Sequence, residues 1–237
     1  MLEGTQILEI LKDFANEFGK NGKKLSNGPW KKRSIFFELP YWTTNKLRHN
    51  FDVMHIEKNI CDSILGNLLD IEGKTKDHVN AHYDLQNMGI RNDLHPREIG
   101  KGRVEYSLAC FTMNAYEKSS FCGVFKTTKL PYGSASNISK CVHVNNRKIS
   151  GYKSHDAHFM LHYLLPVAIK NTMPDIVVEP LIRFGSFFRF ICQKVIHLQD
   201  MDYLEAEVVQ ILCQLEMIFP PSFFDIMVHF LSICQMK

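Results

Sequence analysis

The sequence predicts a mainly α-helical protein. Along most of the chain, apolar residues recur at steps of three and four, the spacing of a helix with one buried face. Strict alternation of apolar and polar residues, which is typical of a half-buried strand, is nearly absent. With 237 residues, of which 45% are hydrophobic and 22% charged, the chain is long enough to bury a core and has an ordinary globular composition.

The first part of the chain is predicted to hold two helices and one strand. Apolar residues at helical spacing indicate a helix over residues 5–18, and the Gly-, Lys- and Asn-rich residues 19–29 indicate a linker. The apolar run at residues 34–39, which Pro40 ends, is predicted to be a short buried strand. A long amphipathic helix follows over residues 53–69.

The rest of the chain is predicted to be helices joined by irregular segments. Residues 73–105 are polar and interrupted by Gly and Pro, so we expect short helices and loops there. Helical spacing then returns, and it predicts helices over residues 107–122, 154–171, 179–197 and 200–218.

Several functional classes are disfavoured by the sequence. No apolar run approaches the ~18 residues of a membrane span, and no secretory signal is evident, so we expect a nuclear or cytoplasmic protein that is not secreted. The seven cysteines are scattered, odd in number and never form Cys-x-x-Cys, which favours reduced, mostly buried thiols. No phosphate-binding Gly-rich loop and no Gly-x-Ser-x-Gly occurs, and no small-molecule substrate is evident.

The most informative segment is residues 47–59, LRHNFDVMHIEKN. It carries two acids, two histidines, two bases and two amides on an apolar frame, and such polar groups must be paired or cost about a few kcal/mol each. Asp52 and His55 are three residues apart and so lie close on a helical turn. A carboxylate there could hold a divalent metal beside a nucleic-acid phosphate. The alternative is that Asp52 caps the helix that begins near Met54.

A basic segment without acidic residues precedes this motif. Its bases are Lys20, Lys23, Lys24, Lys31, Lys32 and Arg33. Such a cluster can contact the phosphates of double-stranded DNA or act as a nuclear import signal, and we assign the DNA contacts to Lys23, Lys24, Lys31, Lys32 and Arg33. The glycines of the same stretch equally suit a solvated linker, and the net charge of +3 is too small to decide.

Residues 49–59 resemble the hallmark of plant CACTA-class (Enhancer/Suppressor-mutator) transposases. In that family an Asp-x-x-His element accompanies the second acid of an RNase H-like catalytic triad. The resemblance implies that Asp52 is this acid, that His55 is the accompanying histidine, and that residues 34–55 hold a short remnant of an RNase H-like α/β core. It implies Mg²⁺ as a cofactor only where an intact catalytic core is supplied, and otherwise none.

The resemblance covers most of the chain. Other segments that fit the transposase in the same order are residues 30–42, 73–77, 88–91, 94–96, 130–133, 136–139 and 151–156. From about residue 164 the sequence resembles the plant domain of unknown function 4218, which accompanies the transposase core. We therefore expect an N-terminal helix and basic linker over 1–29, a transposase-derived segment over 30–150, and a truncated helical companion domain over 151–237.

Two departures from the family bear on activity. The region that carries the first catalytic acid is missing upstream of Asp52, and residues 230–237 depart from the family pattern. Two-metal phosphoryl transfer needs several carboxylates around ions about 4 Å apart, so we expect no strand cleavage from this chain alone. The predicted function is a DNA-contacting transposase fragment. The alternative is a helical interaction module that docks another transposase chain or a host protein.

Three histidines share one face of the helix predicted over residues 154–171. His155, His158 and His162 stand at three- and four-residue steps, a spacing that can chelate zinc. The stretch lacks the Glu that a metalloprotease helix would carry between its histidines. We therefore favour satisfied or partly exposed histidines and predict no metal site.

Overall fold

The structure, a computed structural model, divides into two compact units, Met1–Phe51 and Asp52–Lys237. Helices dominate, which confirms the predicted mainly α fold class. Within the described ranges, no helix is both long and apolar enough to cross a membrane. The residues that the structure describes are 3–12, 14, 34–45, 52–100, 102–130, 133 and 137–233.

The first unit contains the helix α1, Gly4–Ile10, and the 3-10 helix η1, Ile35–Glu38. The strand predicted over residues 34–39 is therefore wrong. The Ser34 hydroxyl accepts the backbone N–H of Phe36 at 3.3 Å, which starts a helical turn instead. The described residues within 34–55 include no strand, so the RNase H-like remnant stays a prediction.

The second unit is organised around α2, Val53–Leu68, close to its predicted range. Most of its residues from Ile56 onward are buried, and a helix buried on so much of its circumference must be packed from several sides. It packs against α5, Ser154–Phe159, and against α9, Ile226–Ile233. The boundary predicted at residue 150 therefore falls inside this unit, because α2 and α5 lie on opposite sides of it in the sequence.

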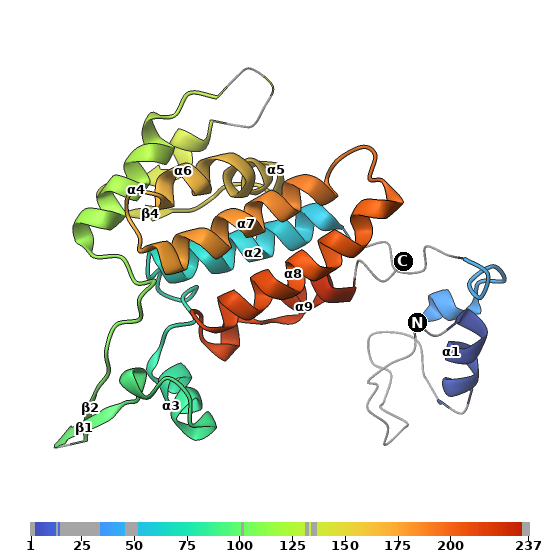
Figure 1. Cartoon of the computed structure of the whole chain (residues 1–237), viewed down its shortest axis with the longest axis horizontal. Coiled ribbons are helices and arrows are strands. Elements are labelled where there is room, and N and C mark those ends of the chain that lie inside the picture. The colour runs from blue at the N-terminus through green and yellow to red at the C-terminus, as the bar shows by residue number, and fades with distance from the viewer. Residues whose placement is uncertain are drawn as a thin grey trace. The chain divides into compact units, whose positions relative to one another are not determined.

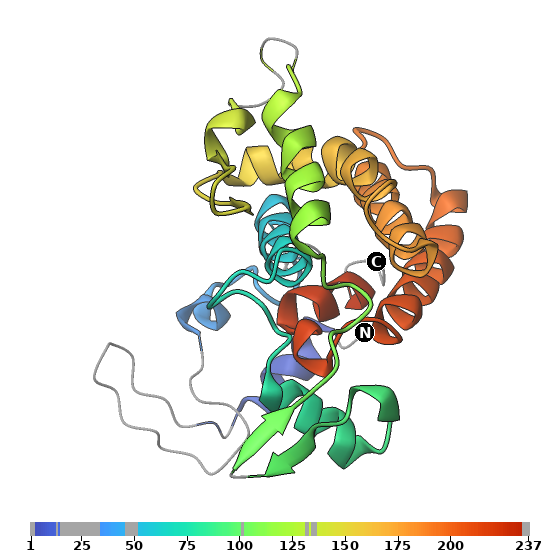
Figure 2. The same ribbon diagram turned by 90° about the vertical axis from the view of Figure 1, so that its left-hand side faces the viewer.

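Four further helices pair around this centre. α7, Asp175–Ile191, lies beside α8, Met201–Glu216, and α4, Ala115–Thr127, packs on α6, Leu165–Ile169 (Figures 1 and 2). α4 begins later than its predicted range because Asn114 caps it: the Asn114 side chain accepts the backbone N–H groups of Tyr116 and Glu117 at 2.9 and 3.0 Å.

The polar middle of the chain contains α3, Val79–Met88, and a hairpin that was not predicted. β1, Arg97–Gly100, pairs antiparallel with β2, Arg103–Glu105, and this hairpin extends away from α2 and α7 (Figures 1 and 2). A second short pair joins residues 142–143 (β3) to residues 148–149 (β4). Strands of two to four residues are too short to display alternation, which is why periodicity missed them.

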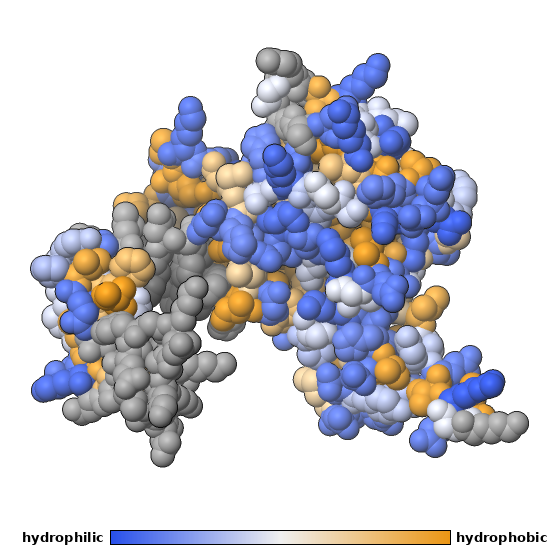
Figure 3. All heavy atoms as spheres, turned by 180° about the vertical axis from the view of Figure 1, so that it is seen from behind, coloured by the Kyte–Doolittle hydropathy of each residue, from blue (hydrophilic) through white to orange (hydrophobic). Residues whose placement is uncertain are grey.

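Phenylalanines from the helices and from the segments between them fill the core of the second unit. The Phe219 ring stacks on Phe223 at 4.3 Å and on Phe111 at 4.7 Å between centroids. On the face seen in Figure 3, hydrophilic side chains lie between the exposed hydrophobic ones of this unit. The fully buried phenylalanines are Phe111, Phe121, Phe125, Phe184, Phe188, Phe219 and Phe223.

The helix predicted over residues 154–171 is interrupted by one π-helical segment, Met160–Leu164. It ends just before Pro166, whose ring nitrogen has no N–H to donate to the preceding turn. α7 approaches this segment closely at Gly185: a Cβ atom there would lie 2.7 Å from the Leu161 carbonyl oxygen. A glycine is therefore required where the two helices touch.

We expect Gly185→Ala to lower the free energy of unfolding by about 1–3 kcal/mol. The clash with the Leu161 carbonyl outweighs the gain in helix propensity of about 1 kcal/mol. Denaturant unfolding followed by circular dichroism measures the change. Gly123→Ala in α4 is the matched control, because no atom lies within 4 Å of its added Cβ, and it should stabilise the protein. Equal effects of the two substitutions would contradict the close-approach argument.

Candidate functional site

Asp52 is the N-cap of α2. Its backbone is extended and its carboxylate accepts the backbone N–H of His55 at 3.1 Å, which confirms the capping alternative. Both residues are exposed. Among the described residues, the group of potential metal ligands that lies close together does not include Asp52 or His55. Their implied catalytic roles stay a prediction.

The basic residues assigned to DNA contact lie outside the described part of the chain. These are Lys23, Lys24, Lys31, Lys32 and Arg33. Their assignment therefore rests on the sequence alone.

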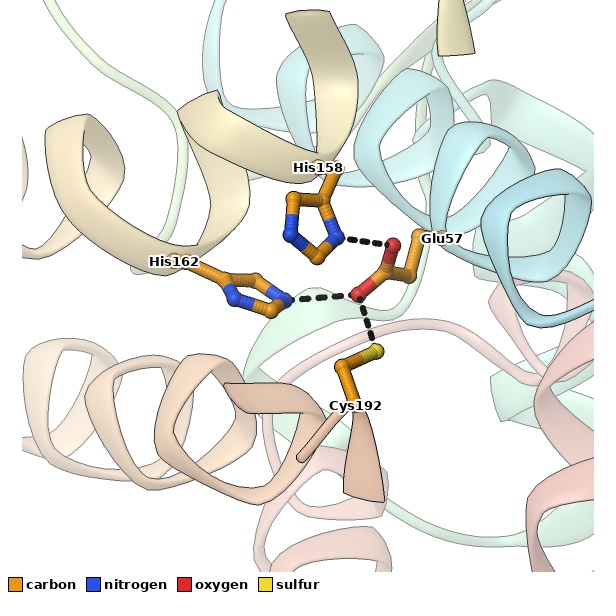
Figure 4. A group of neighbouring side chains, drawn as sticks. All are labelled: Glu57, His158, His162 and Cys192. Atoms are coloured by element: carbon orange, nitrogen blue, oxygen red, sulfur yellow. Dashed lines mark hydrogen bonds and ion pairs between the residues drawn. The ribbon is translucent and has the colours of Figure 1, made fainter. Parts of the chain in front are cut away.

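Further along α2, the Glu57 side chain is completely buried and meets three other functional side chains. Its two carboxylate oxygens accept hydrogen bonds from His158 Nδ1 at 2.7 Å and from His162 Nε2 at 2.6 Å. The Cys192 thiol also faces this carboxylate, with Sγ 3.7 Å from Oε1. Figure 4 shows the four side chains pointing toward one another, and their ligand-type atoms all lie within 4.8 Å. We call Glu57, His158, His162 and Cys192 the Glu57 cluster.

Three helices position this cluster. Glu57 stands between Ile56 and Ile60 on the buried face of α2. His158 lies in the last turn of α5 and His162 in the π-helical segment, and their rings pack with centroids 4.0 Å apart. Cys192 terminates α7, where its backbone N–H donates to the Phe188 carbonyl at 3.0 Å.

Electrostatics define what the cluster can do. A buried carboxylate is costly unless cationic or hydrogen-bonding partners compensate it, and the two imidazoles supply donors. Burial, with the nearby Glu57 charge and hydrogen bond, raises the pKa of the Cys192 thiol to about 12. A thiol that is protonated at neutral pH is a poor nucleophile, so the arrangement does not suit cysteine-based hydrolysis. Its nitrogen, oxygen and sulfur donors are instead the atom types that bind transition metals.

A second polar group on α2 is centred on Asp62. Its carboxylate accepts hydrogen bonds from Lys58, from Lys74 at 2.9 Å and from the Tyr152 hydroxyl at 2.8 Å. Burial by itself would raise the pKa of Asp62, but these three donors outweigh it and hold the pKa below its usual value. Through Lys74, this group connects α2 to the segment that follows it. Through Tyr152, it connects α2 to the residues just before α5.

A third buried group involves His82 of α3. Its Nε2 lies 2.7 Å from Asp77 Oδ1, and its Nδ1 lies 2.7 Å from the Leu94 carbonyl oxygen. Both ring nitrogens therefore have protein partners, and the histidine connects α3 to the loop that follows it.

Helical spacing in the sequence indicated half of the Glu57 cluster. It placed His158 and His162 on one helix face, together with His155, which is exposed and lies outside the cluster. It missed Glu57 and Cys192, which lie 101 and 34 residues from His158 in the sequence. The usable signal was an acidic residue on the apolar face of a predicted helix, because such a residue requires a partner from elsewhere.

One family model matches the chain. The family is described as a domain of unknown function (DUF4218), and the match covers residues 191–235. No curated protein and no solved structure matches the chain significantly. The C-terminal part of the predicted companion domain is thus similar to DUF4218. The match continues past residue 229, where the departure from the family pattern was expected to begin.

We expect Asp52→Ala to lower the free energy of unfolding by about 1 kcal/mol, because the first turn of α2 loses its cap. Urea unfolding measures the change. Asp52→Asn keeps a capping oxygen and should remain close to wild type. If Asn costs as much as Ala, the negative charge of Asp52 matters more than its hydrogen bond.

The lowered pKa of Asp62 predicts an acid-dependent loss of stability. A carboxyl group with a depressed folded-state pKa stabilises the protein above its unfolded-state pKa of about 3.9, and this contribution disappears as pH falls through the folded-state value. We expect the Tm of wild type to fall more steeply below about pH 4 than that of Asp62→Asn. Lys74→Met should give an intermediate slope, and identical slopes in all three proteins would contradict the assignment.

Proposed function

We propose that this chain is a transposon-derived helical protein, a fragment of a CACTA-type DNA transposase that contacts duplex DNA and does not cleave it. The observation that carries the proposal is the packing of the segment similar to DUF4218 on the helix that begins at the Asp-x-x-His element. α9 of that segment contacts α2, and both belong to one compact unit. Two neighbouring modules of a transposase would be expected to share a core in this way.

The surroundings of Asp52 support the absence of cleavage. Strand cleavage by two metal ions needs several carboxylates that converge on ions about 4 Å apart. Asp52 is exposed and uses its carboxylate to cap α2. On this proposal Mg²⁺ acts only where another chain supplies an intact catalytic core, and Asp52 with His55 is a relic of a site.

DNA contact is assigned to the basic segment, residues 20–33. It contains no acidic residue, and lysines and arginines in such density bind phosphate through charge alone. The proposed partners are double-stranded DNA and another transposase chain, in the nucleus or cytoplasm. No small-molecule substrate is part of the proposal.

The alternative function is a helical module that docks another protein. It is favoured by a groove of about 460 Å³ beside α8 and α9, within the segment similar to DUF4218. Apolar contacts of such a groove would be insensitive to salt, whereas phosphate contacts weaken steeply as salt rises. The residues that line the groove are Val209, Leu212, Cys213, Glu216, Phe224, Asp225, Ile226 and Val228.

A fluorescence-anisotropy titration with duplex DNA over a salt series tests the proposal. Neutralising Lys31, Lys32 and Arg33 to Gln should reduce the slope of log K against log salt by about 3, roughly one per lost phosphate contact. Added Mg²⁺ should produce no cleaved DNA.

A matched control neutralises three bases around the β3–β4 hairpin: Lys140, Arg147 and Lys148. This variant should keep the wild-type slope. Absence of binding at low salt would overturn the DNA proposal and leave the interaction module. An equal loss in both variants would show that DNA contact is not specific to residues 20–33.

A further inference from the structure

We propose that the Glu57 cluster binds one zinc ion, with Glu57, His158, His162 and Cys192 as its four ligands. The site would be structural, and it goes beyond the proposed function because it depends on neither DNA nor transposase ancestry. The bound ion would connect α2 to α5, to the π-helical segment Met160–Leu164 and to the end of α7.

The geometry lies within a small movement of a tetrahedral site. Zinc bonds of about 2.0 to 2.3 Å place neighbouring ligand atoms roughly 3.2 to 3.8 Å apart. The pair Cys192 Sγ and Glu57 Oε1 is already at 3.7 Å. The two imidazole nitrogens, at 2.6 and 2.7 Å from the carboxylate, would have to move outward by about 1 Å or less as a metal replaces the hydrogen bonds.

The charges of the ligands balance those of the ion. The Glu57 carboxylate and the Cys192 thiolate together carry two negative charges, so a bound Zn²⁺ would leave the buried site neutral. Binding would release the Cys192 thiol proton to solvent, and each imidazole would carry its single proton on the ring nitrogen that does not face the ion, Nε2 in His158 and Nδ1 in His162. No group would be oxidised or reduced. This compensates the completely buried Glu57 without requiring a protonated histidine beside it.

The donor set selects zinc over the common alternatives. Ca²⁺ and Mg²⁺ prefer oxygen ligands, and the cluster supplies two nitrogens and one sulfur. Four protein ligands leave no open position for water or substrate, which is the arrangement of structural rather than catalytic zinc. Cys192 is exposed and the His158 side chain is 29% exposed, so the cluster borders solvent although Glu57 itself is buried.

The backbone around the histidines supports the assignment. His162 lies in the π-helical segment, and single π turns within α-helices often occur at functional sites. The segment brings His162 Nε2 and His158 Nδ1 onto the two different oxygens of one carboxylate. Two histidines that only filled the core would not need to direct both ring nitrogens, His158 Nδ1 and His162 Nε2, at the same carboxylate.

Titration of the reduced, chelator-treated full chain with Co²⁺ tests the site. One Co²⁺ per chain should bind with the visible absorption of tetrahedral cobalt and a thiolate charge-transfer band, and Zn²⁺ should displace it. Cys192→Ser should abolish the charge-transfer band, and Glu57→Gln should weaken binding by at least ~10-fold. Zn²⁺ should raise the Tm of wild type and have a smaller effect on either variant.

Two controls keep the outcome decisive. Cys213→Ser removes an exposed cysteine of α8, and His155→Gln removes the exposed histidine next to the cluster, so both should bind Co²⁺ as wild type does. Circular dichroism shows whether each variant is folded, and Cys192→Ser, at the exposed end of the site, still tests it if Glu57→Gln unfolds. Failure of wild type to bind Co²⁺ or Zn²⁺ stoichiometrically, or unchanged spectra in Cys192→Ser, would overturn the proposal and leave a hydrogen-bonded buried carboxylate.

Discussion

The second unit depends on one buried charge, the carboxylate of Glu57 on α2. An acid that is removed completely from solvent must be compensated within the protein. Its compensation comes from His158, His162 and Cys192, which belong to α5, the π segment and the end of α7. The requirement to pair one carboxylate therefore fixes how three helices meet, in addition to the apolar packing that brings them together.

The same rule applies along the rest of α2. Asp62 is held by Lys58, Lys74 and Tyr152, and the side chain of Asn67 accepts the Lys76 backbone N–H at 2.8 Å. Each of these partners except Lys58 lies outside α2, so the polar residues of this helix anchor the segments around it. A helix that is buried on most sides can carry polar residues only where such partners exist.

The segment similar to DUF4218 is integrated into this arrangement. Cys192, near the start of this segment, belongs to the Glu57 cluster. Near the end of the segment, α9 packs on α2. Between them, the guanidinium of Arg91 donates to the carbonyls of residues 217–219, which directly follow α8. The matched family thus covers part of a compact unit that also contains the Asp-x-x-His element, and this shared core is the observation behind the proposed transposon origin.

The sequence by itself determined the helical class, the range of α2 and the start of α8, because helical periodicity is a local property. It offered the cap at Asp52 only as an alternative, which the structure then showed. It also placed His158 and His162 on one face. Tertiary structure decided the 3-10 helix at residues 35–38, the two short hairpins and the partners of Glu57. Which distant side chain meets a buried acid depends on how helices pack, and no local spacing encodes that contact.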